Sequence, residues 1–215
     1  MKLNLHTAKV ADWEKEGGPH NIWQKIASKS YGALTPANLA SIAGGIIAVY
    51  GLFLIANEEV LSGLLLVAIG RIADLVDGLI AEYTKTKSPL GELVDVTMDK
   101  IVLALALIVF VSISLIPWPI IAVVALQNIA NVVISLAAKL KKKVIHPSSY
   151  GKLATALSWV AIILYPLGDW IRQNTSEGAG TLLVWTALAS FGIYLVIGFK
   201  ASLSYMKTLY KIAAK

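Results

Sequence analysis

The sequence contains no cysteine and only three histidines, His6, His20 and His146. Without cysteine, disulfides, thiolate catalysis and zinc-finger ligation are excluded. The histidines are scattered along the chain and lack the spacing of metal ligands. Charge is also scarce, since charged residues make up 15% of the chain, against about 25% in a typical soluble domain. This low charge points away from a soluble globular protein.

Long apolar runs take the place of the missing charge. Hydrophobic residues form 57% of the 215 residues, and the mean hydropathy is +0.70. Several runs approach 20 residues, the length that a helix needs to cross a bilayer core of about 30 Å. The sequence therefore predicts an all-α fold, an integral membrane bundle of six transmembrane helices. The expected spans cover residues 36–56, 60–83, 90–115, 118–139, 151–171 and 180–204.

The basic residues indicate how this bundle is oriented. Of the 19 Lys and Arg residues, 16 lie on one side of the predicted spans, and the opposite loops hold only Arg172. Because basic loops stay on the inner side of a membrane, we expect both termini in the cytoplasm and the protein in the cell membrane. The residues of the inner side are Lys2, Lys9, Lys15, Lys25, Lys29, Lys85, Lys87, Lys139, Lys141, Lys142, Lys143, Lys152, Lys200, Lys207, Lys211 and Lys215.

The segment before the first span carries a short amphipathic pattern. Ile22, Trp23, Ile26 and Ala27 would share one face of a helix. This pattern predicts an interfacial helix on the inner leaflet, with an ordinary polar lead-in as the alternative. The first 30 residues lack the apolar core of a signal peptide. The expected organisation is a cytoplasmic N-terminal segment, a membrane domain and a cytoplasmic tail, over residues 1–34, 35–206 and 207–215.

Four aspartates interrupt two of the apolar segments. Asp74 and Asp77 stand at i and i+3 in the second predicted span, and Asp95 and Asp99 stand at i and i+4 in the third. Residues at these spacings share one helical face, and a short loop makes the two spans antiparallel neighbours. Counting back from the loop places Asp99 level with Asp74, and Asp95 level with Asp77. We therefore expect four carboxylates to converge, roughly 12 Å below the helix ends at 1.5 Å per residue.

Such a cluster needs compensating charge. An acid at the centre of a transmembrane helix costs about 2.5–3.5 kcal/mol, and neighbouring carboxylates repel one another. Carboxylates without His or Cys favour a hard divalent ion, namely Mg²⁺, Mn²⁺ or Ca²⁺, and such ions usually act on phosphates. The small residues Gly78, Ala81 and Gly91 would leave space for a bulky group such as a nucleotide. A divalent-cation transporter is an alternative, but the sequence lacks matching acids toward the outer face.

This stretch resembles the signature of the CDP-alcohol phosphotransferases, Asp-x2-Asp-Gly-x2-Ala-Arg-x8-Gly-x3-Asp-x3-Asp. Seven of the eight fixed positions agree, and the exception is Glu82, which stands where the family has arginine. This reversed charge keeps open weakened nucleotide binding or an inactive lipid-binding relative. In this chain the signature reads Asp74-x2-Asp77-Gly78-x2-Ala81-Glu82-x8-Gly91-x3-Asp95-x3-Asp99.

The resemblance implies a reaction and a set of roles. A CDP-linked lipid, usually CDP-diacylglycerol, would give its phosphatidyl group to a small polar alcohol and release CMP. Two Mg²⁺ or Mn²⁺ ions per site would be held by Asp74, Asp77 and Asp95, and Asp99 would be the catalytic base while touching the second ion. Gly78, Ala81 and Gly91 would lie at the nucleotide. A homodimer in contact with membrane lipids is implied, and no nucleic-acid partner is expected.

A weaker resemblance concerns the acceptor. Gly151, Lys152 and Thr155 match part of the Gly-Lys-x-Lys-Thr stretch of phosphatidylglycerophosphate synthases, with Ala154 in place of the second lysine. Glycerol 3-phosphate is therefore the expected acceptor, and Lys152 and Thr155 would bind its phosphate. Inositol phosphate, inositol and serine stay open, as does a purely topological role for Lys152. Arg71, one turn from Asp74, is expected to pair with Asp74 or Asp99 rather than contact substrate.

Overall fold

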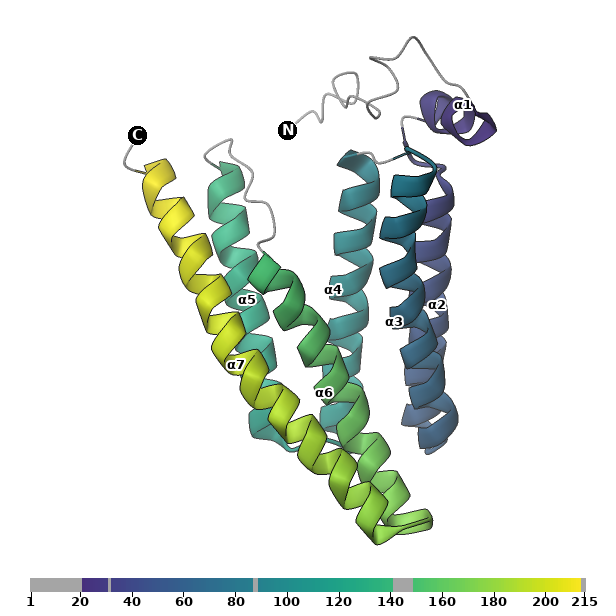
Figure 1. Ribbon diagram of the computed structural model, residues 1–215, viewed down its shortest axis with the longest axis vertical. Coiled ribbons are helices and arrows are strands. Elements are labelled where there is room, and N and C mark those ends of the chain that lie inside the picture. The colour runs from purple at the N-terminus through teal and green to yellow at the C-terminus, as the bar shows by residue number, and fades with distance from the viewer. Residues whose placement is uncertain (1–20, 31, 87–88, 141–148, 214–215) are drawn as a thin grey trace. The chain divides into compact units, whose positions relative to one another are not determined.

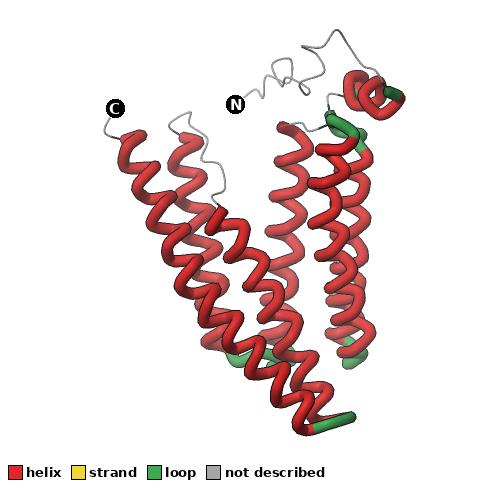
Figure 2. Tube along the Cα trace, viewed as in Figure 1, coloured by secondary structure: helices red, strands yellow, loops and turns green. Residues whose placement is uncertain are grey.

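The computed structural model describes residues 21–30, 32–86, 89–140 and 149–213. Helices and short connections account for this part of the chain, where no strand occurs (Figures 1 and 2), so the all-α prediction is confirmed. The described helices are α1 Ile22–Lys29, α2 Pro36–Ala56, α3 Val60–Tyr83, α4 Pro89–Ser112, α5 Trp118–Leu140, α6 Ser149–Asn174 and α7 Glu177–Ala213. Outside the described residues lie His6, His20, His146, Lys2, Lys9, Lys15, Lys87, Lys141, Lys142, Lys143 and Lys215.

Each of the six predicted spans coincides with one helix, from α2 to α7, within a few residues at most ends. The exception is α7, which continues to Ala213 and so passes the predicted boundary between residues 206 and 207. Among the described residues, three helical segments are long and apolar enough to cross a membrane: Pro36–Ala56, Ser149–Asn174 and Glu177–Tyr210. The number of six spans stays a prediction.

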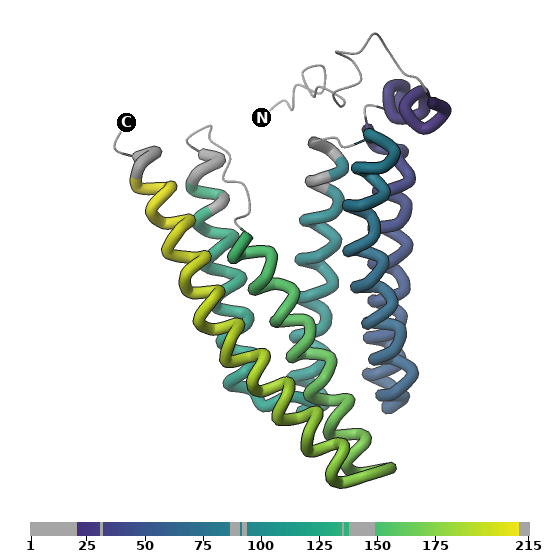
Figure 3. Tube along the Cα trace, viewed as in Figure 1, coloured from purple at the N-terminus to yellow at the C-terminus, as the bar shows by residue number. Residues whose placement is uncertain are grey.

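The chain divides into two compact units, Met1–Ala106 and Leu107–Lys215, and the boundary falls within α4. The colours of Figure 3 follow the chain through the first unit, in purple to teal, and then through the second, in teal to yellow. Each unit is built around an antiparallel pair of helices that are consecutive in the sequence. These pairs are α2 with α3, and α6 with α7.

Glycines bring α2 and α3 close together along their length. A methyl group on Gly51 would lie 2.6 Å from the carbonyl oxygen of Gly63, and one on Gly44 would lie 2.9 Å from that of Gly70. Contacts this short leave no room for a side chain, so glycine is required at these crossings. The tight packing fixes the register of α3, which carries two of the four aspartates, against α2.

Caps define where α1 and α2 begin. The Asn21 side chain accepts a hydrogen bond from the backbone of Gln24 at 2.8 Å, and the Gln24 side chain accepts one from Asn21 at 3.3 Å, which forms a capping box. Buried Gln24 also donates to the Thr84 carbonyl at 3.5 Å, just beyond α3. Thr35 caps α2, and Pro36 stands in its first turn, where proline is well tolerated. The predicted helix at α1 is therefore present, while its place at a membrane surface stays a prediction.

Small residues and a polar contact between helices contribute to the packing of the second unit. A methyl group on Gly168 of α6 would lie 2.9 Å from the carbonyl oxygen of Gly180 in α7. Helix α5 joins α7 through the Ser202 hydroxyl, which donates to Asn131 at 3.0 Å. Trp159 of α6 is buried.

Candidate functional site

Three of the predicted aspartates come together from two helices. Asp74 and Asp77 lie one turn apart on α3, and Asp95 lies on α4. One carboxylate oxygen from each residue lies within 4.8 Å of those of the other two. Asp77 is buried, and Asp74 and Asp95 are partly buried. The predicted convergence is therefore observed for these three side chains.

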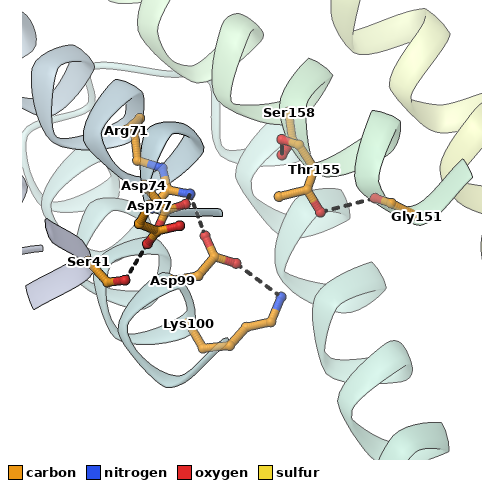
Figure 4. Close-up of polar contacts among 9 residues, drawn as sticks. All are labelled: Ser41, Arg71, Asp74, Asp77, Asp99, Lys100, Gly151, Thr155 and Ser158. Atoms are coloured by element: carbon orange, nitrogen blue, oxygen red, sulfur yellow. Dashed lines mark hydrogen bonds and ion pairs between the residues drawn. The ribbon is translucent and has the colours of Figure 1, made fainter. Parts of the chain in front are cut away.

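The fourth aspartate is held by an arginine. Arg71 stands one turn before Asp74, and its Nη2 atom lies 2.6 Å from Asp74 Oδ2 and 2.8 Å from Asp99 Oδ1 (Figure 4). Asp99 is therefore level with Asp74, as the count from the loop predicts. The other Asp99 oxygen lies 3.8 Å from the Lys100 amine. The expected pairing of Arg71 with one of the two acids is confirmed, and it extends to both.

A hydroxyl from a third helix fixes Asp77. Ser41 of α2 is buried, and its hydroxyl donates to Asp77 Oδ2. The same hydroxyl lies 3.1 Å from the Ala37 carbonyl of its own helix. The Ser41 hydroxyl therefore engages one of the two Asp77 carboxylate oxygens.

The donor set suits a divalent ion. Oxygens on opposite sides of Mg²⁺ lie about 4.2 Å apart, and those around Ca²⁺ lie up to about 5 Å apart. The three aspartate oxygens, within 4.8 Å of one another, fit this range. All are carboxylate oxygens, the ligands that hard cations prefer. The residues therefore fit a metal site held by Asp74, Asp77 and Asp95.

The small residues of the motif lie beside this cluster in sequence. Gly78 is exposed, and a methyl group on it would meet no described atom within 4 Å. Ala81 and Gly91 are partly buried. Glu82, which replaces the family arginine, is exposed at the last turn of α3. Open space at Gly78 is compatible with a ligand there, and the roles of these residues stay predictions.

The predicted acceptor residues belong to the second unit. Lys152 is exposed on the first turn of α6. The Thr155 hydroxyl donates to the Gly151 carbonyl at 3.1 Å, and Figure 4 shows this contact within α6. Thr155 keeps the capacity to accept a hydrogen bond, since a hydroxyl oxygen has two lone pairs.

Sequence reasoning missed Ser41. A lone serine in an apolar helix usually forms a hydrogen bond with the carbonyl four residues earlier, and Ser41 has this contact too. The residues around Ser41 therefore do not indicate a partner on another helix. Ser41 and Asp77 are 36 residues apart, and neither helical periodicity nor a short loop brings residues at that separation together. The contact depends on the α2–α3 register, which the glycine crossings set.

Comparison with known proteins adds an independent observation. Residues 34–193 match the family model described as CDP-alcohol phosphatidyltransferase, and the match includes every predicted site residue. No solved structure matches the chain significantly. Enzymes of this family are transferases of phospholipid biosynthesis, are typically metal-dependent and reside in membranes. The chain belongs to the CDP-alcohol phosphatidyltransferase family, whose members transfer a phosphatidyl group from a CDP-alcohol to an acceptor.

Proposed function

We propose that this chain transfers the phosphatidyl group of a CDP-linked lipid, such as CDP-diacylglycerol, to glycerol 3-phosphate and releases CMP. The observation that carries the proposal is the grouping of Asp74, Asp77 and Asp95, with oxygens within 4.8 Å of one another, inside the matched family segment. The resemblance to phosphatidylglycerophosphate synthases in Gly151, Lys152 and Thr155 supports the choice of acceptor.

The aspartate group would hold two Mg²⁺ or Mn²⁺ ions, with Asp99 touching the second. Bound there, the ions would neutralise the diphosphate and stabilise charge on the attacking and leaving oxygens. Ser41 would keep Asp77 in its orientation, because its hydroxyl engages one carboxylate oxygen. This arrangement spares the aspartates the cost of reorganising when substrate arrives.

Asp99 would act as the general base. Its carboxylate would accept the proton of the acceptor hydroxyl, and the acceptor oxygen would then form a bond to the phosphorus of the phosphatidyl group. The bond from that phosphorus to the CMP oxygen breaks, and its electron pair leaves with CMP. The contact of Asp99 Oδ1 with Arg71, at 2.8 Å, would hold the side chain in place before the metal ions bind.

The two substrates would occupy different places. Gly78, Ala81 and Gly91 would border the cytidine, and the open space at Gly78 supports this assignment. Lys152 would bind the acceptor's phosphate through a charge-assisted hydrogen bond, and Thr155 would add a second polar contact. Exposure of Lys152 on the first turn of α6 supports its access to a soluble substrate.

The membrane arrangement completes the proposal. Helices α2 to α7 would be the six spans, α1 would lie on the inner leaflet, and both termini and the active site would face the cytoplasm. The exposed side chains of Ile22 and Trp23 on α1 are suited to a membrane interface. The protein would work as a homodimer in contact with membrane lipids.

Release of CMP from CDP-diacylglycerol tests this function. The purified protein in liposomes with Mg²⁺ would be given glycerol 3-phosphate, inositol phosphate, inositol or serine separately. We expect CMP and a lipid product with glycerol 3-phosphate, loss of activity in EDTA, and recovery on adding Mg²⁺ or Mn²⁺. Turnover only with another alcohol would overturn the acceptor. Ion flux without CMP release would indicate a transporter, and neither activity would indicate an inactive lipid-binding relative.

A further inference from the structure

Arg71 places a positive charge directly beside the aspartates of the site. Arg71 brings one guanidinium nitrogen within 2.6 Å of Asp74 Oδ2 and 2.8 Å of Asp99 Oδ1. Asp74 belongs to the group that fits a metal ion. The guanidinium therefore lies against carboxylates that the proposed metal ions would also use.

Burial makes this contact strong. The Arg71 side chain is 13% exposed, and those of Asp74 and Asp99 are 15% and 16% exposed. Charges that are shielded from water attract and repel each other more strongly than charges at a surface. A divalent ion entering the group would meet a fixed positive charge, and two of the carboxylates would already have a cationic partner.

We propose that Arg71 competes with the metal for Asp74 and Asp99. In the metal-free protein its guanidinium neutralises part of the acidic cluster and holds α3 to α4. Binding of the metal moves it off at least one of the two carboxylates. Arg71 thereby weakens the affinity of the site for divalent ions, while it protects the fold when no ion is bound. This inference rests on the proposed function, because it takes the aspartates as the metal ligands.

The sequence offers an unusually clean way to observe this. The chain contains only two arginines, Arg71 and Arg172. Arg172 forms a comparable ion pair with Asp169, at 2.6 Å one turn away on α6, and its side chain is 49% exposed. Selective ¹⁵N-arginine labelling therefore gives two guanidinium signals, of which one reports on the site and the other is an internal control. The variant Arg172→Gln assigns them.

The first measurement is a titration of the labelled, unaltered protein with Mg²⁺. We expect the Arg71 signal to shift as the ion binds and the Arg172 signal to stay in place. Metal binding that leaves the Arg71 signal unchanged would overturn the inference without touching the proposed function. The proposed function has its own test here, since Asp95→Asn should abolish the binding. Absence of any binding by the unaltered protein would overturn both.

The second measurement is the affinity for Mn²⁺, from electron paramagnetic resonance of the free ion. Arg71→Gln removes the competing charge at similar size, so we expect binding at least about tenfold tighter than in the unaltered protein. Arg71→Lys keeps the charge and should stay within about threefold, as should Arg172→Gln. Equal or weaker binding by Arg71→Gln would mean that Arg71 supports the metal site, and the inference would be wrong.

A third measurement covers the fold. Arg71→Gln leaves the aspartates without their counter-charge, so the metal-free variant should unfold at a lower temperature than the unaltered protein. Saturating Mg²⁺ should raise the unfolding temperature of the variant by more than it raises that of the unaltered protein. An equal increase in both proteins would contradict the proposed role. If Arg71→Gln cannot be purified, the guanidinium signal of the unaltered protein still decides the question.

Discussion

The two arginines of this chain form ion pairs of the same length in different surroundings. Arg71 and Arg172 each lie 2.6 Å from an aspartate one turn away on their own helix. At the end of α6, the side chains of Arg172 and Asp169 are 49% and 30% exposed, and Asp169 otherwise accepts from Gln173 on the same helix. On α3, Arg71 and Asp74 are 13% and 15% exposed, and Arg71 reaches Asp99 on another helix.

The comparison shows that local spacing alone does not make a site. Exposed ion pairs contribute about 0–1 kcal/mol to stability, because water screens them. Removing one partner of a buried pair costs about 3–5 kcal/mol, because it leaves an uncompensated charge. What distinguishes the α3 pair is a second helix that adds Asp95 and Asp99, and a third that adds Ser41. Substitutions should therefore have large effects in the α3–α4 cluster and small effects at Asp169 and Arg172.

The largest difference is expected between Asp95→Asn and Asp169→Asn. Asp95→Asn removes a proposed metal ligand, so activity and Mn²⁺ binding should be lost together. We expect affinity to fall by more than about 100-fold, since even outer partners of a metal ligand are worth about 10- to 100-fold. Asp169→Asn should leave both within about fivefold. Full activity of Asp95→Asn, or of the unaltered protein in EDTA, would contradict the metal assignment.

The next effect separates the base from the ligands. Asp99 lies outside the group of three carboxylates and contacts Arg71 instead. Asp99→Asn should therefore leave binding of the CDP-lipid within about tenfold and lower kcat by at least about 100-fold, the usual range for a general base. Single-turnover kinetics and equilibrium binding of the lipid would measure the two effects. If binding of the CDP-lipid falls as much as kcat does, Asp99 acts mainly as a metal ligand.

A smaller effect is expected at Lys152, an exposed residue that is proposed to contact only the phosphate of the acceptor. Lys152→Ala should raise the KM for glycerol 3-phosphate by roughly 10- to 150-fold, the equivalent of a charge-assisted hydrogen bond of about 1.5–3 kcal/mol. The KM for the CDP-lipid should not change, nor should turnover of an unphosphorylated alcohol. Lys200→Ala, at an exposed lysine of α7, is the matched control. Unchanged glycerol 3-phosphate kinetics in Lys152→Ala would overturn the acceptor assignment.

The helices were largely predictable because long apolar runs leave few alternatives. Ala56 ends α2 and Tyr83 ends α3, both at the predicted positions. Helix α7 continues to Ala213, beyond the end of the apolar run. Hydropathy predicts only the apolar run, so it does not predict the last turns of this helix. The division into two units within α4 has no signal in the composition.

The site was predictable only where it follows helical periodicity. Spacing along α3 and α4 places Asp74, Asp77 and Asp95 correctly, and it makes Arg71 a neighbour of Asp74. It cannot show that Ser41 reaches Asp77, because that contact depends on how closely the glycines let α2 approach α3. Contacts within a helix or across a short loop can be read from the sequence, whereas contacts set by packing distance cannot.

The smallest effect is expected at Glu82, the one departure from the family signature. Glu82 is exposed at the end of α3, one turn beyond Gly78, where the nucleotide is proposed to bind. A negative charge near a diphosphate is unfavourable, and exposure to water weakens the repulsion. We therefore expect Glu82→Arg to raise kcat/KM for the CDP-lipid about fivefold, which corresponds to roughly 1 kcal/mol.

Glu82→Gln separates the two parts of that change. It removes the negative charge without adding a positive one, so it should give part of the gain if repulsion is the cause. A gain in Glu82→Arg alone would instead indicate a new contact between arginine and phosphate. Steady-state kinetics at two salt concentrations would check the mechanism, since an effect of exposed charge should shrink at high salt. A loss of activity in both variants would mean that the carboxylate has acquired a function of its own.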